Sequence, residues 1–206
     1  MMAPPLKKLL KQQFGHPSGM LGHVAGWIMA LQNHDRTEWV VQQLKANRDD
    51  HILEIGVGPG VAVQLLAEIV LDGTIAGIDS SPVMIDHAST RNYPAIQSGR
   101  VDLRLASVEE LPFEAGTFDK VFAVNTLHHW ENPKLGLNAI YNVLKSRGQI
   151  VIVEQPRGVS PDAIDLVGTI SERLKTQLET AGFENPSVKS QPTDSTPIVY
   201  VQASKP

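Results

Sequence analysis

Several of the residues best suited to chemistry in this chain follow short apolar runs. Glu54 lies near the end of one such run and is followed by Gly56, Gly58 and Gly60. Glycines at alternate positions allow a tight turn on which a ligand can lie directly against the main chain. Asp79 follows a second apolar run, where its carboxylate could accept two hydrogen bonds from a ribose diol. The alternative for Asp79 is a turn or helix-capping role.

A pair of adjacent histidines forms a second group of candidates. His128 and His129 follow a fourth apolar run and precede Trp130. Imidazole changes its protonation state near neutral pH, so either histidine could act as a general base. His128 is nearer to the end of the run and is the better candidate. The alternative is that one histidine caps a helix or packs with Trp130 while the other faces solvent.

An alternation of strands and helices must position these residues. Buried parallel strands appear as short apolar runs, and amphipathic helices place apolar residues three and four positions apart. We therefore expect strands at 52–55, 74–78, 101–105, 120–124, 144–154 and 197–203, and helices at 20–33, 35–46, 61–71, 133–144 and 171–181. Ser81 and Pro82 predict the start of one more helix. The alternation indicates a doubly wound α/β sheet that is mostly parallel and closes with an antiparallel strand.

Three kinds of nucleotide site place a glycine turn between a strand and a helix, and spacing separates them. A P-loop needs Lys-Ser or Lys-Thr after its second glycine, and this chain has neither there. A dinucleotide fingerprint needs glycine at position 61, where the chain has Val61. The acid-x-Gly-x-Gly-x-Gly spacing from Glu54 to Gly60 resembles motif I of the class I S-adenosylmethionine-dependent methyltransferases.

Further motifs extend this resemblance over about residues 48 to 203. Asn125, followed after Thr126 by Leu-His-His, resembles the fourth-strand motif of small-molecule methyltransferases with this fold. The Leu-Pro-Phe turn at 111–113 and the fifth strand at 144–154 are also similar to family motifs. The family has an acidic residue that contacts the adenine amino group where this chain has Ser107, whose hydroxyl can accept the same bond.

The resemblance implies a fold, a cofactor and a set of binding residues. The fold is a seven-stranded Rossmann-like α/β sheet, doubly wound and mostly parallel, with an antiparallel last strand and an N-terminal helical cap. The cofactor is S-adenosyl-L-methionine. The residues implied in binding it are Glu54, Gly56, Gly58, Gly60, Asp79, Ser80, Ser107, Val108 and Asn125. We expect one domain over 1–206, with residues 1–47 as the cap and 48–206 as the cofactor-binding core.

The N-terminal segment has two interpretations. It could be a helical cover that packs on one side of the sheet, with Trp27 in the core. It could instead be a lid over the acceptor, because it mixes polar and bulky apolar groups in a glycine-rich setting. On the lid hypothesis, His23 and Trp27 contact the acceptor together with Trp130.

Composition excludes several other classes of protein. The 206 residues carry a net charge of −4 and no basic cluster of the size that binding to a nucleic-acid backbone needs. The chain has no cysteine, which excludes disulfides and thiolate sites. No cluster of aspartate and histidine at ligand spacing suggests a metal. The most apolar stretch, residues 20–31, is too short to span a membrane, so we expect a soluble, cytoplasmic protein.

The resulting functional hypothesis is a methyltransferase that acts on the oxygen or nitrogen of a compact small molecule, such as a carboxylate oxygen. Such a reaction needs orientation, exclusion of water and, for a protonated acceptor, a base. A nicotinamide-dependent oxidoreductase is disfavoured by Val61 and by the lack of a Tyr-x-x-x-Lys pair. A non-catalytic partner subunit that keeps the pocket is the third hypothesis. An amphipathic N-terminal segment also leaves a homo-oligomer open.

Overall fold

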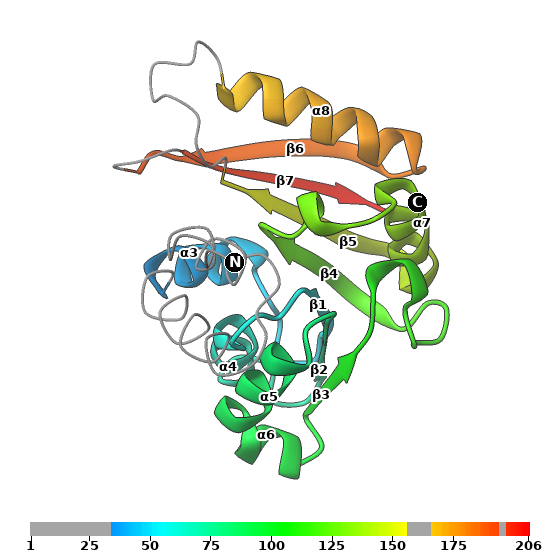
Figure 1. The fold of residues 1–206 in the computed structure, drawn as a ribbon. Helices are drawn as coiled ribbons and strands as arrows, with labels where there is room; N and C mark the ends of the chain where they lie inside the picture. The colour runs from blue at the N-terminus through cyan, green and yellow to red at the C-terminus, as the bar shows by residue number, and fades with distance from the viewer. Residues whose placement is uncertain (1–33, 156–165, 194–196) are drawn as a thin grey trace, which may run out of the picture. The chain divides into compact units, whose positions relative to one another are not determined.

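The computed structural model of the chain describes residues 34–155, 166–193 and 197–206 (Figure 1). Its contacts divide these residues into two compact units. Unit 1 consists of the described residues up to 49 together with 56–106, and unit 2 consists of 50–55 together with the described residues from 107 to 206. Each unit has its own strands and helices.

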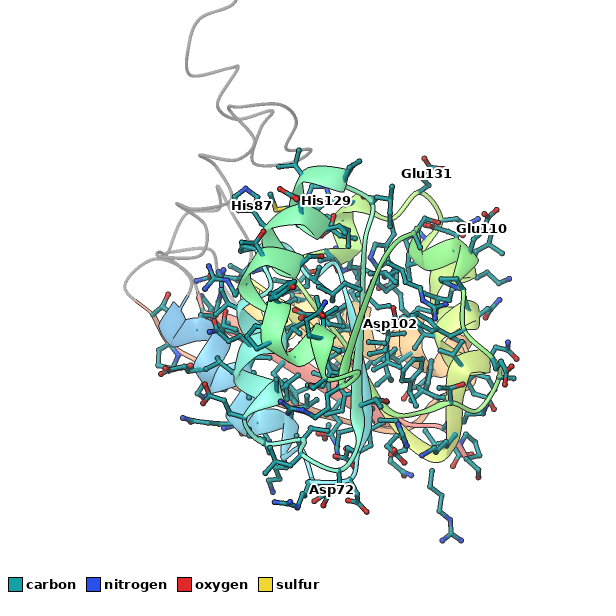
Figure 2. All side chains as sticks on the ribbon, turned by 90° about the horizontal axis from the view of Figure 1, so that it is seen from below. Asp72, His87, Asp102, Glu110, His129 and Glu131 are labelled. Atoms are coloured by element: carbon teal, nitrogen blue, oxygen red, sulfur yellow. The ribbon has the colours of Figure 1, made fainter. Side chains whose placement is uncertain are left out.

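Unit 1 contains two parallel strands and four helices. These are α3 (His34–Leu44), α4 (Val61–Ala67), β2 (Thr74–Asp79), α5 (Pro82–Arg91), α6 (Tyr93–Gln97) and β3 (Val101–Leu105). Strand β2 pairs with β3 so that Asp79 lies opposite Leu105 at the carboxyl end. Helix α3 packs on α4, and α5 packs on both strands. Asp72, just before β2, and His87, in the helix that follows it, lie at opposite ends of the unit (Figure 2).

The helix boundaries of unit 1 follow from local capping. Ser81 Oγ accepts a hydrogen bond from Met84 N at 3.4 Å, and Pro82 occupies the first turn of α5, as the sequence predicts. Helix α4 ends at Ala67, four residues earlier than the periodicity suggests. Val70 beyond its end is fully buried, whereas Leu71 is exposed. Of the apolar residues that suggested a longer helix, only Val70 is buried, while Ile69 and Leu71 are exposed.

Unit 2 contains five strands in the order β1-β4-β5-β7-β6. Its elements are β1 (His51–Ile55), η1 (Val108–Glu110), β4 (Phe118–Val124), η2 (Leu127–His129), α7 (Pro133–Val143), β5 (Leu144–Glu154), α8 (Leu166–Thr180), β6 (Glu184–Gln191) and β7 (Ile198–Ser204). The first three strands in this order are parallel, and β7 is antiparallel to both of its neighbours. Helix α8 lies along β6 and β7 (Figure 1).

The parallel strands of unit 2 are buried on both faces. Successive residues such as Ile52 and Leu53 in β1, or Val121 and Phe122 in β4, are all fully buried. Burial without alternation requires cover on both sides of the sheet, which explains the continuous apolar runs. Because β4 and β5 are parallel, their carboxyl ends lie side by side, where Val124 pairs with Val153, next to Glu154.

At the amino edge of unit 2, charged residues form a paired cluster. Lys120 forms a buried ion pair with Asp50. Asp119 accepts hydrogen bonds from the backbone N–H of His51 at 2.8 Å and from Lys145 Nζ at 2.8 Å. Partial burial acts to raise the pKa of the Asp119 carboxyl, but the Lys145 and His51 bonds outweigh it and hold that pKa below its usual range. These contacts lie near the amino ends of β1 and β4, whereas Asn125 and His128 follow the carboxyl end of β4.

The fold class expected from the sequence is confirmed. The strands belong to a seven-stranded, mostly parallel α/β sheet whose last strand, β7, runs antiparallel to β5. Strand β6 and helix α6 were not expected from the sequence. Most of the predicted helical cap, residues 1–33, lies outside the described residues. In the parts of the chain that the structure describes, every helix is too short or too polar to cross a membrane.

Candidate functional site

The glycine turn between β1 and α4 has a left-handed backbone at three positions. The φ angles of Gly56, Gly58 and Gly60 are +76°, +51° and +77°. Side chains with a Cβ rarely adopt this region, so the turn requires glycine at alternate positions. The spacing that singled out this stretch in the sequence thus has a direct conformational cause.

The backbone N–H groups of the turn are bonded within unit 1. Gly56 N and Val57 N both donate to Ile78 O, at 2.8 and 3.0 Å, and Gly60 N donates to Val57 O at 3.0 Å. Gly58 N donates to Asp79 Oδ2 at 2.9 Å. By contrast, the carbonyl oxygens of Gly56 and Gly58 accept no hydrogen bond from any residue that the structure describes. The turn therefore offers acceptors to a ligand rather than donors.

This polarity separates the ligands that compete for such a turn. A dinucleotide pyrophosphate is an anion and needs backbone N–H donors aimed at it. Here the donors from 56 to 60 are occupied, and the Asp79 carboxylate adds negative charge beside the turn. The methionyl ammonium of adenosylmethionine is a cation and needs acceptors. The carbonyl acceptors of the turn fit this ammonium group.

The space around the glycines differs between positions. A Cβ added at Gly58 would meet nothing within 4 Å, so this position faces open space. A Cβ at Gly60 would lie 2.8 Å from Ala88 Cα and 2.7 Å from Asn92 Nδ2. Gly60 therefore allows α5 to pack closely on the turn, while Gly58 leaves a surface that a ligand can approach. These features fit the predicted cofactor.

Asp79 has the turn role that the sequence offered as the alternative, and its ribose role stays a prediction. Its Oδ2 accepts from Gly58 N and its Oδ1 from Ser81 N, both at 2.9 Å, so the carboxylate links the turn to the start of α5. A carboxylate oxygen can accept more than one hydrogen bond, as a contact with a ribose diol would need. Ser80, the next residue, is exposed in the bend after β2.

In unit 2, Asn125 follows β4 with an unusual backbone. Its φ is +53°, and its backbone N donates to Val153 O at 2.8 Å. Its Oδ1 accepts from Gln155 N at 2.6 Å. Its buried Nδ2, like the buried Oγ of Thr126, has no hydrogen-bond partner among the described residues. A strained backbone and two buried polar atoms without a partner at the carboxyl edge indicate a place for a ligand.

The two histidines follow directly in η2. The Nδ1 atom of His128 lies 3.8 Å from Glu154 Oε2, at the end of β5. The His128 side chain is 49% exposed and that of Glu154 10%. The rings of His128 and His129 are in contact, with centroids 4.0 Å apart. A carboxylate thus stands beside an imidazole that a small molecule can reach.

The remaining predicted residues lie at varied depths in unit 2. Glu54 is buried near the end of β1. Ser107 is exposed and hydrogen-bonded to the Glu109 side chain. The Val108 side chain is buried next to Gly136 of α7, and the Trp130 ring also contacts that glycine.

Two predicted substrate residues, His23 and Trp27, lie outside the described residues. Three residues that the sequence analysis did not propose join the candidate site. Glu154 could have been found because it ends the fifth apolar strand. Arg91 and Asn92, which contact the glycine turn, lie at the end of α5 and had no sequence signal. In the part of the chain that the structure describes, no group of three or more metal-binding side chains gathers.

Comparison with known proteins gives consistent results. Residues 53–152 match the family model described as a methyltransferase domain. The chain is 33% identical over 185 residues to the uncharacterized methyltransferase YdaC of Bacillus subtilis, and the match covers 89% of this chain and 98% of YdaC.

Two more distant proteins match smaller shares of their own length. A match of 31% identity to the ubiquinone/menaquinone biosynthesis C-methyltransferase UbiE of a Geobacter species covers 56% of this chain and half of UbiE. Haemonchus contortus phosphoethanolamine N-methyltransferase 2, solved with S-adenosylhomocysteine, superposes with a TM-score of 0.75 at 15% identity. That match covers 99% of this chain and 61% of the other, and it concerns the fold alone.

Proposed function

The chain belongs to the class I S-adenosylmethionine-dependent methyltransferases, and from this we propose that it methylates an oxygen or nitrogen atom of a compact small molecule with His128 as the general base. The family and the cofactor leave no ground for the oxidoreductase alternative. What we propose is the class of acceptor and the roles of the individual residues.

The cofactor, when bound, supplies a methyl group activated by a sulfonium. We assign its binding in unit 1 to the open face of Gly58 and the Asp79 carboxylate. Gly58 admits the ligand without a side chain in the way, and Asp79 offers an acceptor to a ribose. The chain's contribution to the reaction is mainly orientation and the removal of a proton from the acceptor.

The observation that carries the base assignment is the position of His128 beside Glu154. A distance of 3.8 Å is too long for a hydrogen bond but close enough for an ion pair once the imidazole is protonated. When His128 takes the acceptor's proton, the buried Glu154 carboxylate stabilises the imidazolium that forms. The neighbouring His129 ring has the opposite effect if it is charged.

This arrangement favours an acceptor that loses a proton during transfer, such as a hydroxyl or an amine. A carboxylate acceptor needs no base, and the negative charge of Glu154 would repel it. A second candidate is methylation of an acidic carbon, because one relative is named a C-methyltransferase. Such a carbon also loses a proton, so His128 would have the same role.

An acceptor screen tests the activity. The protein is incubated with methyl-¹³C-adenosylmethionine and panels of phenols, amines, carboxylates and acidic carbon compounds, and release of adenosylhomocysteine is measured. The ¹³C chemical shift of the product then identifies the atom that received the methyl group. We expect turnover with a hydroxyl or an amine. Turnover with carboxylates alone would contradict the proposal.

Variants at three positions test the base. His128→Gln should lower turnover at saturating cofactor by at least about 10²-fold, as expected for loss of a general base. Glu154→Gln should give a smaller loss and move the rise of rate with pH toward lower pH, because the imidazolium loses its anionic neighbour. His129→Gln is the matched control and should keep most activity. Parental rates and pH profiles in the first two variants would rule out the proposed base.

A further inference from the structure

The end of α5 is tied to the glycine turn by two side chains. Arg91 Nε donates to the carbonyl of Pro59 at 2.8 Å. Asn92 Nδ2 donates to the carbonyl of Gly60 at 3.0 Å. Each of these bonds spans 32 positions in the chain. They hold the backbone immediately after Gly58, the position whose open face we assign to the cofactor.

The Asn92 side chain is an unfavourable choice for stability alone. It is 3% exposed, and its buried Oδ1 has no hydrogen-bond partner among the described residues. Its Nδ2 also donates to Ala88 O at 2.9 Å. Yet the carbonyls of Gly60 and Ala88 each accept a backbone bond as well, from Gln64 N at 3.2 Å and Asn92 N at 3.0 Å. Both carbonyls therefore have a hydrogen-bond donor without the Asn92 side chain, and burial of the Asn92 Oδ1 without a hydrogen bond lowers the stability of the fold.

Arg91 adds a second link at the same place. Besides its bond to Pro59, its Nη1 donates to Gln64 Oε1 of α4 at 3.3 Å. The guanidinium therefore connects the turn, the helix that follows it and α5. Because Pro59 has no N–H of its own, the position of its peptide unit depends on what its carbonyl binds.

We propose that Arg91 and Asn92 are positioning residues for cofactor binding, which clamp the turn at 58–60 in its left-handed conformation before the ligand arrives. This rests on the proposed function, in which that turn binds adenosylmethionine. A glycine-containing segment has the greatest backbone freedom in a chain, and a ligand that must order it binds more weakly. The clamp raises affinity without touching the ligand.

Three variants separate positioning from simple stabilisation. Asn92→Leu keeps a similar branched shape, removes both amide bonds and removes the unpaired Oδ1. Arg91→Met removes the guanidinium but keeps the aliphatic stem. Arg100→Met is the matched control, because Arg100 Nη1 also donates to a backbone carbonyl at 2.8 Å, that of Ala67 at the other end of α4.

The measurements are calorimetric titration with S-adenosylhomocysteine, thermal melting, and amide hydrogen exchange of the peptide covering 54–62. We expect Asn92→Leu and Arg91→Met each to raise the Kd about tenfold. Exchange in the turn should be faster without ligand and return to the parental level when ligand is bound. The Tm of Asn92→Leu should be equal to or above the parental value. Arg100→Met should keep the parental Kd.

The outcomes are distinguishable. If Asn92→Leu and Arg91→Met bind within twofold of the parent while Asp79→Asn binds weakly, the clamp is refuted and the cofactor site stands. If Asp79→Asn also binds normally, the proposed cofactor site is itself misplaced. If affinity falls only together with Tm and exchange in the turn is unchanged, the two residues are structural and the proposal is wrong.

Discussion

Replacement of Asp79 by asparagine is the most direct probe of the candidate cofactor site. The carboxylate accepts from Gly58 N through one oxygen and from Ser81 N through the other. Asparagine keeps the shape but turns one acceptor oxygen into an N–H₂ donor, which must face one of these two backbone donors. The variant therefore loses a bond that shapes the turn as well as the charge available to a ribose.

The magnitude follows from these contacts. A hydrogen bond to a charged group contributes about 1.5–3 kcal/mol, so a loss of about 2 kcal/mol in cofactor binding corresponds to a roughly 30-fold rise in Kd. The lost bond within the turn should also lower the free energy of unfolding by about 1 kcal/mol, or about 2–4 °C in Tm for a chain of this size.

Calorimetric titration with S-adenosylhomocysteine at pH 7 measures the affinity, and thermal melting measures the stability. Asp72→Asn is the control, since Asp72 lies before the other end of β2, in an exposed ion pair with Arg48 (Figure 2). It should leave the Kd unchanged. An Asp79→Asn protein that folds and binds within twofold of the parent would refute the assignment of the site.

Two further predictions concern stability. Gly60→Ala should lower the free energy of unfolding by at least about 2 kcal/mol, because the alanine would have a left-handed φ and its Cβ would lie 2.8 Å from Ala88. The control is Gly116→Ala, at φ +65° in open space, which should lower it by only about 1 kcal/mol. Equal losses of the two variants in chemical denaturation would contradict the packing argument. The second follows from the pKa of Asp119, which is held below its usual range despite partial burial. The contribution of this carboxylate to stability is complete above about pH 4 and is lost as the pH falls through the lowered pKa, so Asp119→Asn and Lys145→Met should be less stable than the parent at pH 7 and approach it near pH 2. A stability difference that stays constant across urea titrations in that pH range would exclude this linkage.

The sequence alone determined the elements whose signals are local. Alternate glycines from Gly56 to Gly60 need no knowledge of the fold to indicate a left-handed turn, and a Ser-Pro pair before an apolar face indicates a helix start. The buried strands β1, β4 and β5 were recognisable because both of their faces are covered, which leaves a continuous apolar run. The carboxyl ends of β2 and β4 followed from similar apolar runs, and with them Asp79 at the end of β2 and Asn125 and His128 after β4.

Strand β6 could not be found in this way. Its sequence, Glu184 to Gln191, is mostly polar and partly or fully exposed, and among the described strands it pairs with β7 alone, at the end of the strand order. An edge strand with one open side does not need an apolar run, so its conformation is set by the backbone bonds of its neighbour. Helix α4 was predicted too long because Ile69, Val70 and Leu71 continue the apolar spacing, although only Val70 is buried.

Only the tertiary structure decided which groups meet. His128 and Glu154 are 26 positions apart, and Arg91 and Pro59 are 32 apart, so no local pattern records their contacts. Nor does the sequence show that the N–H groups of the turn are already bonded while the carbonyls of Gly56 and Gly58 are available. Hydrogen bonds between distant residues depend on how strands and helices pack, and packing is a property of the whole chain. The sequence identified the family's motifs, and the packing determined the polarity of the turn, the neighbour of His128 and the bonds from Arg91 and Asn92 to the turn.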